Sequence, residues 1–506
     1  MRAKKLCALL LALSMTILLC SCWEEDEGDE FWNETLPGEQ EDEIVETRIS
    51  SFALPYLQNH TFDPVTCIDG IQQAIGALLY EGLFALDEGF LPQKVLCSNY
   101  TYDAQKRTYT FYVRDDATFS DGSPLSASDV LAVYRRAAAS ERYGTRFDNV
   151  SSMLLSGNAL VITLKQENSA FPALLDIPIV KDGSEKDLVP LGTGPYLFLT
   201  NNGSTCLIKN TDWWRAADFP IERIALVSAR DNGTASYLIS SYDVHLLVSD
   251  LTGTATTGSV GEVDVFDADS TAMLYLGFNT RRTILSESSV RHAMSNSIHR
   301  DTIVSALLSG HARAAQFPIS PAAALYPSGS FASGTDYAQA LSDAGVSSKH
   351  PKTLTLLVNR ESSFKLSVAE ALCRELSADA LSITLKALPW EDYLLALQTG
   401  NFDLYLGETK LTADWNAAPL ISTAGALNYG GYADDEADRL LGAFLANETQ
   451  STAQAYFQHF EQSAPIAPIA FKSVSTQISA GLVENACPTA ANPFYNFDQW
   501  TLHLEQ

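Results

Sequence analysis

Positive charge is scarce in this sequence. Its 33 Lys and Arg residues are outnumbered by 61 Asp and Glu residues, which leaves a formal net charge of −28 at pH 7. A surface with this balance repels polyanions, so we expect no nucleic acid partner and no broad binding of anions.

Several motifs of catalysis and metal binding are also missing. There is no GxSxG nucleophile elbow, no SxxK motif followed by a KTG-like triad and no glycine-rich phosphate loop. A catalytic site assembled from distant residues would leave no such motif. The eight histidines form no HxxxH or HExxH pattern and no two cysteines form a CxxC pair. We therefore expect no zinc or redox chemistry and no cofactor.

Long apolar runs are missing everywhere except near the N-terminus. Residues 6–19 are apolar apart from Ser14 and Thr16, and a basic stretch precedes them. This run is too short for a stable transmembrane helix, which needs about 17 to 25 residues. It has the length of a signal-peptide core. No later apolar run approaches a membrane-spanning length, so no further transmembrane segment is expected.

The apolar run ends in Leu19-Cys20-Ser21-Cys22, which resembles a bacterial lipobox. On that resemblance, residues 1–21 are a signal peptide that is removed, and Cys22 becomes the mature N-terminus with lipid on its thiol. One acyl chain gives only marginal membrane binding, but the diacylglyceryl group that the resemblance implies has at least two chains. The alternative is a plain signal peptide with incidental cysteines.

The segment after Cys22 is strongly acidic. Positions 24 to 43 contain eleven Asp and Glu residues, and no Lys or Arg occurs until Arg48. Such a segment buries too little apolar surface to fold, and its self-repulsion keeps it extended. We predict that residues 22–48 are a lipid-anchored tether that holds a folded body off the membrane. An acidic interaction tail is the alternative.

The body is large and has few covalent constraints. Removing the first 48 of 506 residues leaves 458, more than one hydrophobic core usually holds, so we expect two or more lobes. If Cys22 is lipidated, an odd number of cysteines remains at wide spacings, so the fold cannot depend on a full disulfide framework. These cysteines are Cys67, Cys97, Cys206, Cys373 and Cys487.

The two halves of the body differ in the order of their predicted helices and strands. The first half has a helical pattern at 68–84 and a helix with Ser126 as its N-cap, and strand patterns at 49–57, 108–114, 159–164, 196–199, 207–209 and 273–278. In the second half, strands at 352–359, 383–388 and 402–407 alternate with helices at 290–308, 365–376, 390–398 and 435–445. This alternation predicts a parallel sheet covered on both faces. A buried strand at 464–472 then returns to the first half, and the C-terminal tail ends in an alternating strand.

Five strings occur in an order typical of one family. They are "LLYEGLFALDEGFLP", "YTFYVRDDATFSDGSPLSASDV", "GTGPY", "LGFNTRRTILSESSVRHAMSNSIHRDTI" and "NYGGYADDEADRLL". Together they resemble the extracellular solute-binding proteins of peptide and nickel ABC importers, from about residue 50 to the C-terminus. Each string also has a plain physical interpretation. The Asp-Gly turn and the Ser cap of the second string, for example, simply join a strand to a helix.

The resemblance implies an α/β, two-lobed, periplasmic-binding-protein-like fold of type II, the peptide-binding class, with an extra subdomain in the first lobe. Hinge strands would join the lobes, which close over a ligand. On this basis the first lobe comprises residues 49–75, 191–278 and 471–506. The extra subdomain comprises residues 76–190, and the second lobe residues 279–470.

The string "ETKLTADWNAAPLI" resembles the region in which peptide binders place the Asp that takes the peptide α-ammonium. Asp414 matches that Asp, and Thr412, Ala413 and Trp415 are the other candidate ligand-binding residues. A desolvated ammonium needs a carboxylate partner, because an unpaired buried charge costs several kcal/mol. Trp415 would form an amphipathic wall of a side-chain pocket. The alternative is a surface-loop Asp beside a packing Trp.

The sequence departs from the family pattern around this segment. The Trp expected before the Asp is missing, and Leu411 and Thr412 occupy its region. Phe364 and Leu397 lie where some oligopeptide binders place an Arg or His for the peptide carboxylate, which leaves Arg360 as a candidate substitute. An α-amine pocket is therefore better supported than any particular peptide length.

The resemblance as a whole implies a binding protein and not an enzyme. We expect a monomeric lipoprotein on the extracytoplasmic face of the cell membrane, delivering short peptides to an ABC permease and its ATPase subunits. The alternatives are a nickel-chelate or other non-peptide solute binder, a receptor that signals to a sensor and, less favoured, an extracellular hydrolase. His292 and His299 are seven apart and would share a face of the predicted helix 290–308, but the family pattern makes that helix scaffold, so no metal site is expected.

Overall fold

The computed structural model describes residues 51–215, 217, 219–253, 261–331 and 336–504. The predicted signal peptide, the lipidated Cys22 and the acidic tether lie outside these residues. All the described residues belong to one compact unit, Ile49–Gln506. Within them, no helix is both long enough and apolar enough to cross a bilayer.

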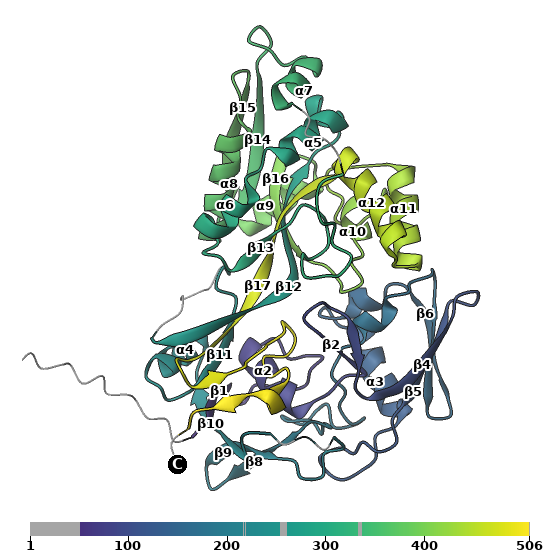
Figure 1. Cartoon of the computed structure of the whole chain (residues 1–506), viewed down its shortest axis with the longest axis vertical. Coiled ribbons are helices and arrows are strands. Elements are labelled where there is room, and N and C mark those ends of the chain that lie inside the picture. Colours follow the sequence, from purple (N-terminus) through teal and green to yellow (C-terminus); the bar gives the residue numbers. More distant parts are fainter. Residues whose placement is uncertain (1–50, 216, 218, 254–260, 332–335, 505–506) are drawn as a thin grey trace, which may run out of the picture. The chain divides into compact units, whose positions relative to one another are not determined.

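Two four-stranded sheets share one hydrophobic core in the part of the fold that we call the first lobe, which from here on includes the predicted extra subdomain. One sheet has the order β1-β10-β9-β8, with β1 parallel to β10 and the other pairs antiparallel. The other, entirely antiparallel, has the order β4-β5-β7-β6. Figure 1 labels β4, β5 and β6 of this sheet. Their strands are β1 (Ala53–Leu57), β4 (Cys97–Asp103), β5 (Thr108–Val113), β6 (Val150–Ser156), β7 (Ala159–Leu164), β8 (Tyr196–Asn201), β9 (Ser204–Lys209) and β10 (Arg223–Ala229).

The local sequence explains the second of these sheets. In β5 the buried side chains of Tyr109, Phe111 and Val113 alternate with more exposed ones, as the period of two requires. Helix α3 (Ala127–Ala138) covers this sheet and begins after Ser126, whose backbone N–H donates to Asp129 Oδ2 at 3.1 Å. The predicted strand and the predicted N-cap are both confirmed.

A larger mixed sheet connects the first lobe to the second lobe, which is built around β14, β15 and β16. Its order is β11-β17-β12-β16-β14-β15, and β13 pairs with β17. Strand β14 is parallel to both of its neighbours, β15 and β16, whereas β12 is antiparallel to β16 and β17. The predicted parallel sheet therefore forms part of a mixed one. The strands are β11 (Leu246–Ser249), β12 (Val263–Phe278), β13 (Ala312–Ala314), β14 (Lys352–Asn359), β15 (Leu381–Leu388), β16 (Leu404–Lys410) and β17 (Ile466–Ser479).

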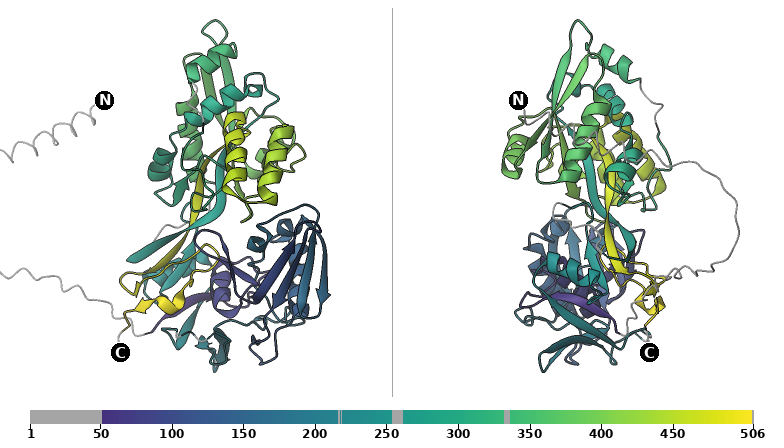
Figure 2. Two further views of the ribbon diagram at one scale, coloured as in Figure 1. Left: turned by 45° about the vertical axis from the view of Figure 1, so that its right-hand side comes forward. Right: turned by 90° about the vertical axis from the view of Figure 1, so that its left-hand side faces the viewer.

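Helices cover the second-lobe part of this sheet. Both α8 (Ser363–Leu376) and α9 (Trp390–Gln398) connect its parallel strands and pack against them, as the predicted alternation requires. Helices α11 (Asp435–Ala446) and α12 (Gln450–Ser463) pack against each other. Figure 2 shows from two further sides that β12 (teal) and β17 (yellow) remain side by side along their length.

The remaining elements are short or lie between these layers. The helices are α2 (Gly70–Leu79), α4 (Asn232–Ser240), α5 (Ser288–Asn296), α6 (Arg300–Thr302), α7 (Tyr337–Asp343) and α10 (Ala418–Ile421). The helical turns are η1 (Gly144–Phe147), η2 (Phe171–Leu174), η3 (Ile284–Ser286), η4 (Ile303–Leu307) and η5 (Phe497–Gln499). The strands are β2 (Phe84–Leu86), β3 (Pro92–Lys94), β18 (Val483–Glu484) and β19 (Thr501–Leu502). The sequence-based division into a first lobe, an extra subdomain and a second lobe stays a prediction in its boundaries.

Three local predictions are wrong in extent. Helix α2 ends at Leu79 and not near residue 84, because the chain turns away so that Gly82 pairs with Pro178. The predicted helix 290–308 is broken between α5 and α6, where the partly buried Arg300 side chain donates to the carbonyls of Ser295, Ala315 and Pro468. The tail forms only the two-residue strand β19.

The break after α5 also separates two histidines. His292 lies on α5, is buried and contacts the Asn296 side chain at 3.0 Å. His299 follows the end of that helix and is exposed, beside Glu375. The expectation that these two histidines share one helix face is therefore wrong.

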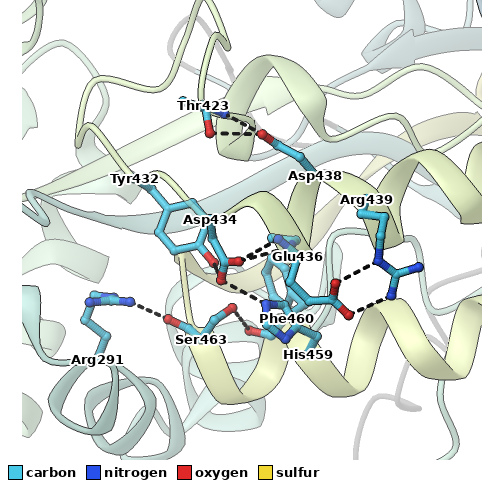
Figure 3. A network of polar contacts seen from close by, with 11 residues as sticks. Arg291, Thr423, Tyr432, Asp434, Glu436, Asp438, Arg439, His459, Phe460 and Ser463 are labelled. Carbon is cyan, nitrogen blue, oxygen red and sulfur yellow. Dashed lines mark hydrogen bonds and ion pairs between the residues drawn. The ribbon is translucent and has the colours of Figure 1, made fainter.

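A polar network joins α11 to α12 (Figure 3). Asp434 is the N-cap of α11, and its Oδ1 accepts hydrogen bonds from the amides of Glu436 and Ala437 at 3.0 and 3.1 Å. Its Oδ2 accepts from the Tyr432 hydroxyl and contacts His459 Nε2 of α12, both at 2.9 Å. Burial opposes ionisation, but these contacts keep the pKa of Asp434 below its ordinary value. The string "NYGGYADDEADRLL" is thus scaffold, as its physical interpretation suggested.

Reciprocal tyrosine–glycine pairs hold β12 against β16. Tyr275 lies opposite Gly407, and Gly277 lies opposite Tyr405, so each ring covers the glycine on the neighbouring strand. The two rings meet edge to face with centroids 5.7 Å apart. A Cβ at position 407 would lie 2.6 Å from Tyr275 Cζ, which is too close for any side chain. Glycine is therefore required here for packing.

We predict that Gly407→Ala lowers the free energy of unfolding by about 1–3 kcal/mol, the usual cost of overpacking a core. Gly442→Ala is the matched control, because a Cβ at this position of α11 would meet nothing within 4 Å. That change should stabilise the protein by up to about 1 kcal/mol through helix propensity. Urea denaturation of both variants checks the two signs, and a neutral Gly407→Ala would contradict the packing argument.

Candidate functional site

A cavity of about 930 Å³ lies between the first and second lobes. Its first-lobe wall comes from α2 and the loop between β2 and β3. Its back is formed by residues 265–272 of β12 and 472–474 of β17, and its second-lobe wall by residues 410–413 at the end of β16. This volume is within the range of about 300–1,000 Å³ that is typical of small-ligand sites. We call this cavity the cleft.

Charged side chains of both signs line the cleft. The carboxylates are those of Asp87, Glu88, Asp176, Asp250, Asp267, Asp269 and Glu408. The cations are those of Arg142, Arg146, Arg313, Lys410 and Lys472. A cleft of this composition suits a ligand that itself carries both charges, because each desolvated charge then meets an opposite one.

One buried lysine links the strands at the back of the cleft. The side chain of Lys472, on β17, is only 6% exposed, and its Nζ lies 2.6 Å from Asp250 Oδ2 and 3.5 Å from Glu408 Oε1. Asp250 follows β11 and Glu408 lies on β16, on opposite sides of β17 in the sheet. Lys365 of α8 contacts the other oxygen of Glu408 at 3.0 Å. The paired carboxylates compensate the burial of the ammonium.

A second group of ion pairs lies on β12. Arg313 Nε lies 2.8 Å from Asp269 Oδ1, and His311 Nδ1 lies 2.9 Å from Asp267 Oδ2. Burial raises the pKa of Asp269. The positive charge of Arg313 opposes this shift, and the neighbouring carboxylates of Asp267 and Glu88 add to it. This edge of the cleft is therefore predominantly negative.

Among the described residues, Lys410 is the cleft-lining cation for which no protein acceptor is found. Arg142 donates to the Cys67 carbonyl and to Gln73 Oε1, and the other Arg and Lys side chains of the lining are paired with carboxylates. Within the described part of the chain, no carboxylate lies within ion-pair distance of Lys410, which is exposed at the end of β16. Its ammonium is therefore available to an anionic group in the cleft.

The segment after β16 contains the four candidate ligand-binding residues. Thr412 and Ala413 line the cleft, whereas Asp414 and Trp415 are buried directly behind them. The Trp415 amide donates to the Thr412 carbonyl at 2.9 Å, and Trp415 adopts a left-handed φ of 54°. A bulky residue rarely adopts this conformation, so this turn is held by its surroundings.

Asp414 lies at a contact between the two lobes. Its Oδ2 accepts a hydrogen bond from Asn168 Nδ2 at 2.7 Å, and its Oδ1 accepts from the Thr412 hydroxyl at 2.5 Å. Asn168 follows β7 in the first lobe. Burial raises the pKa of Asp414, and the hydrogen bonds from Thr412 and Asn168 oppose that shift. The carboxylate is thus desolvated and surrounded by neutral donors, without a cation.

Trp415 packs in an aromatic cluster behind the cleft wall. Its ring meets Phe90, from the first-lobe loop between β2 and β3, edge to face at 5.0 Å, and Phe471 of β17 at 6.0 Å. Phe90 itself lines the cleft. The surface that a ligand meets here is formed by Thr412, Ala413 and Phe90, and the expected contact of Trp415 with ligand stays a prediction.

Sequence reasoning singled out Arg360 for a ligand carboxylate and missed Lys410. Arg360 is exposed, and the residues lining the cleft do not include it. Lys410 is only two residues before Thr412 in the string "ETKLTADW", so its position at the cleft was foreseeable. Its lack of a carboxylate partner was not, because the ion pairs that occupy the other cations join residues far apart in sequence.

The histidine, cysteine and carboxylate side chains bear on metal binding and on disulfides. The described residues contain no group of three or more His, Cys, Asp or Glu side chains arranged to hold a metal ion. The five cysteines of the body are all free thiols. Burial raises the pKa of the Cys97 thiol to about 11.

Two lobes connected by long strands, with a ligand-sized cleft between them, define a solute-binding protein of the periplasmic type. Residues 92–429 match the family model for "Bacterial extracellular solute-binding proteins, family 5 Middle", and the chain belongs to this family. Its members are the extracytoplasmic solute-binding proteins of ABC importers, which deliver ligand to the permease and are not enzymes.

Individual relatives are more distant. The chain is 26% identical over 280 residues to the glutathione-binding protein GsiB of Salmonella typhi, a match that covers 52% of this chain and 55% of the relative. The chain thus spans about half the length of the curated relatives it matches.

Two solved structures illustrate the shared fold. The unliganded open form of MppA, a periplasmic murein tripeptide binding protein, is 19% identical with a TM-score of 0.71, covering 90% of this chain and 98% of that one. NikZ from Campylobacter jejuni in complex with Ni(L-His) is 18% identical with a TM-score of 0.63, covering 89% and 99%. At these identities the likeness concerns the fold alone, and it confirms the predicted two-lobed α/β class.

Proposed function

We propose that this protein captures short peptides in its cleft and delivers them to an ABC permease with its ATPase subunits. The mixed charge of the cleft is the observation that carries this proposal, since carboxylates and the unpaired Lys410 line one cavity. A short peptide presents an ammonium, a carboxylate and a polar main chain, and so needs both signs. Glutathione, for which the curated relative is named, carries the same groups.

Binding would act through closure of the lobes. A ligand that contacts both walls of the cleft binds the closed form more tightly than the open one, and this differential affinity shifts the population toward closure. The second-lobe wall contributes residues 410–413, and the first-lobe wall contributes α2. The permease would then recognise the closed form.

Asp414 is our candidate for the peptide α-ammonium. Its carboxylate is buried, its pKa is raised by desolvation, and its hydrogen-bond partners Asn168 and Thr412 are neutral. A cation would compensate this buried charge better than neutral donors do. Thr412 and Ala413, which line the cleft next to Asp414, would contact the same end of the peptide.

The identity of the bound molecule is the first prediction of this proposal. Native mass spectrometry of the full chain, purified from the membranes of its host, should release short peptides identifiable by their fragment masses. The same peptides should be recovered intact after incubation with the protein. A nickel chelate in their place, or cleavage of the peptides, would contradict the proposal.

The second prediction assigns the two ends of the ligand. Asp414→Asn should weaken binding of the identified peptide by at least about 2 kcal/mol, and Lys410→Gln should do so to a smaller degree because Lys410 is exposed. Each variant lacks one charge that would pair with an end of the peptide. Asp414→Asn should therefore bind the free and the N-acetylated peptide with equal affinity, and Lys410→Gln should bind the free peptide and its C-terminal amide with equal affinity. Calorimetry measures both with the parent peptide, its N-acetylated form and its C-terminal amide.

These variants are controls for each other. N-acetylation of the peptide should weaken its binding to the Lys410→Gln protein and to the parent protein by the same factor. C-terminal amidation of the peptide should weaken its binding to the Asp414→Asn protein and to the parent protein by the same factor. If Asp414→Asn loses affinity equally for the free and the acetylated peptide, then Asp414 contributes to closure but does not bind the ammonium.

We further propose that lipid on Cys22 anchors the protein and that residues 22–48 tether the body. The composition supports this proposal: Cys22 ends a signal-like apolar run, and the acidic stretch after it favours an extended chain. These residues lie outside those that the structure describes.

Cys22→Ala should release the protein into the medium or leave it unprocessed, because no lipid can then attach. Immunoblots of membrane and soluble fractions measure the distribution, with Cys20→Ala as the matched control that should stay in the membrane at the mature size. An unchanged membrane fraction of mature Cys22→Ala protein would defeat the anchor.

A further inference from the structure

The two lobes touch at a polar contact beside the cleft. The donor side is the loop after β7 in the first lobe, where Asn168 Nδ2 donates to Asp414 Oδ2 at 2.7 Å. The Ser169 amide donates to the Leu445 carbonyl of α11 at 2.9 Å, and the Glu448 amide donates to Ser169 Oγ at 3.0 Å. We call these five residues the interlobe contact. Separation of the lobes would break all three hydrogen bonds.

The first-lobe side of the interlobe contact is held in place by its own lobe. The Tyr109 hydroxyl of β5 contacts the carbonyls of Asn168 and Ser169 at 2.9 and 3.1 Å. The Ala170 amide donates to Asn168 Oδ1 at 3.0 Å, which turns the Asn168 amide nitrogen toward Asp414. The loop is therefore ordered before the lobes meet, and forming the contact costs little conformational entropy.

The carboxyl group of Glu448 is the unusual member of the interlobe contact. Glu448 lies between α11 and α12, and its Oε1 is buried with no hydrogen-bond partner among the described residues. The titratable groups facing it are the Asp414 carboxyl, on the segment after β16, and the neutral Tyr109 hydroxyl of β5. No Lys, Arg or His within the described residues forms an ion pair with it.

Two buried carboxyl groups side by side cannot both be charged at low cost. Burial first, and then repulsion by Asp414, raises the pKa of Glu448 from its ordinary value of 4.5 to about 8. Burial also raises the pKa of Asp414. In the open form Glu448 loses the cover of Ser169 and Tyr109 from the first lobe and its side chain regains water. Burial is the larger cause of the shift, so the pKa of Glu448 then returns toward the ordinary value, although Asp414 stays beside it on the second lobe.

We propose that closure of the lobes at the interlobe contact takes up a proton, which is held by Glu448. Closure is then a pH-dependent step of this protein, and a mildly acidic surrounding favours the closed form. The inference goes beyond peptide binding, because the proton is taken up at the contact of the lobes and not by the ligand in the cleft.

The direction of the pH dependence of closure follows from proton linkage. The pKa of Glu448 is higher in the closed form than in the open form, so the advantage of closure is fully present below the open-form value. It is lost as the pH rises through the closed-form value. Between about pH 4.5 and 8 the ratio of closed to open protein should fall by up to tenfold per pH unit, and it should level off above that range.

Amide hydrogen exchange of the full chain without added ligand tests the proposal. The peptides that contain the amides of Ser169 and Glu448 report the contact directly, because both amides donate across it. After correction for the intrinsic chemical rate, their protection should fall between pH 5.5 and 8. In Glu448→Gln, which mimics the neutral carboxyl, protection should stay at the low-pH level throughout. The Leu406 amide of β16 in the second-lobe sheet serves as the control for global folding.

Two further variants make the outcome decisive. Glu370→Gln, an exposed charge on α8, should behave like the parent protein. Asn168→Ala should lose protection at both amides at every pH, because it removes the hydrogen bond to Asp414. Equal protection of the parent and Glu448→Gln across the pH range, whether high or low, would overturn the proposal. Unchanged protection in Asn168→Ala would do the same.

Discussion

The pairing of β12 with β17 is the constraint on which the remaining structure depends. These strands pair antiparallel from Val263↔Ser479 to Gly277↔Ile466, so a single ladder runs from the first lobe into the second. The register is irregular between Asp269 and Met273, where both strands line the cleft. A bulge there lets the ladder bend without breaking the regular pairs on either side. The same short stretch therefore sets the back of the cleft, and the proposed closure of the lobes would bend the ladder there.

Charge burial follows from this arrangement. A ladder that crosses between two lobes brings side chains of both into one low-dielectric region, where each charge needs a partner. Lys472 finds its partners on both sides of β17, in Asp250 and Glu408. Asp414 and Glu448 find only neutral donors and each other. The first arrangement pairs opposite charges and supports the fold, whereas the second is costly and is resolved by a proton or a ligand cation.

Much of the fold was predictable from local pattern. The helix at 390–398, the alternation of β5 and the Ser126 cap depend on neighbours in sequence, and the structure has all three. The helix at 290–308 failed because Arg300 gains four carbonyl acceptors, one of them on β17, when the helix breaks. The same holds for the candidate site. Thr412 and Ala413 were predicted because they lie in a motif. Lys410 and Glu448 were not predicted, because their importance depends on which residues lie near them in the folded structure. No spacing rule encodes such partners.

The two roles proposed for Asp414 are linked through one electrostatic argument. A ligand ammonium beside Asp414 would offset the negative charge that helps to raise the pKa of Glu448. The proton on Glu448 would then be held less tightly, and by reciprocity a proton there would weaken the attraction of the site for a cation. Ligand and proton thus act as alternative countercharges for one pair of carboxyl groups. Closure around a peptide with a free α-ammonium should take up fewer protons than closure around the N-acetylated peptide, because only the free peptide brings a positive charge to the two carboxyl groups.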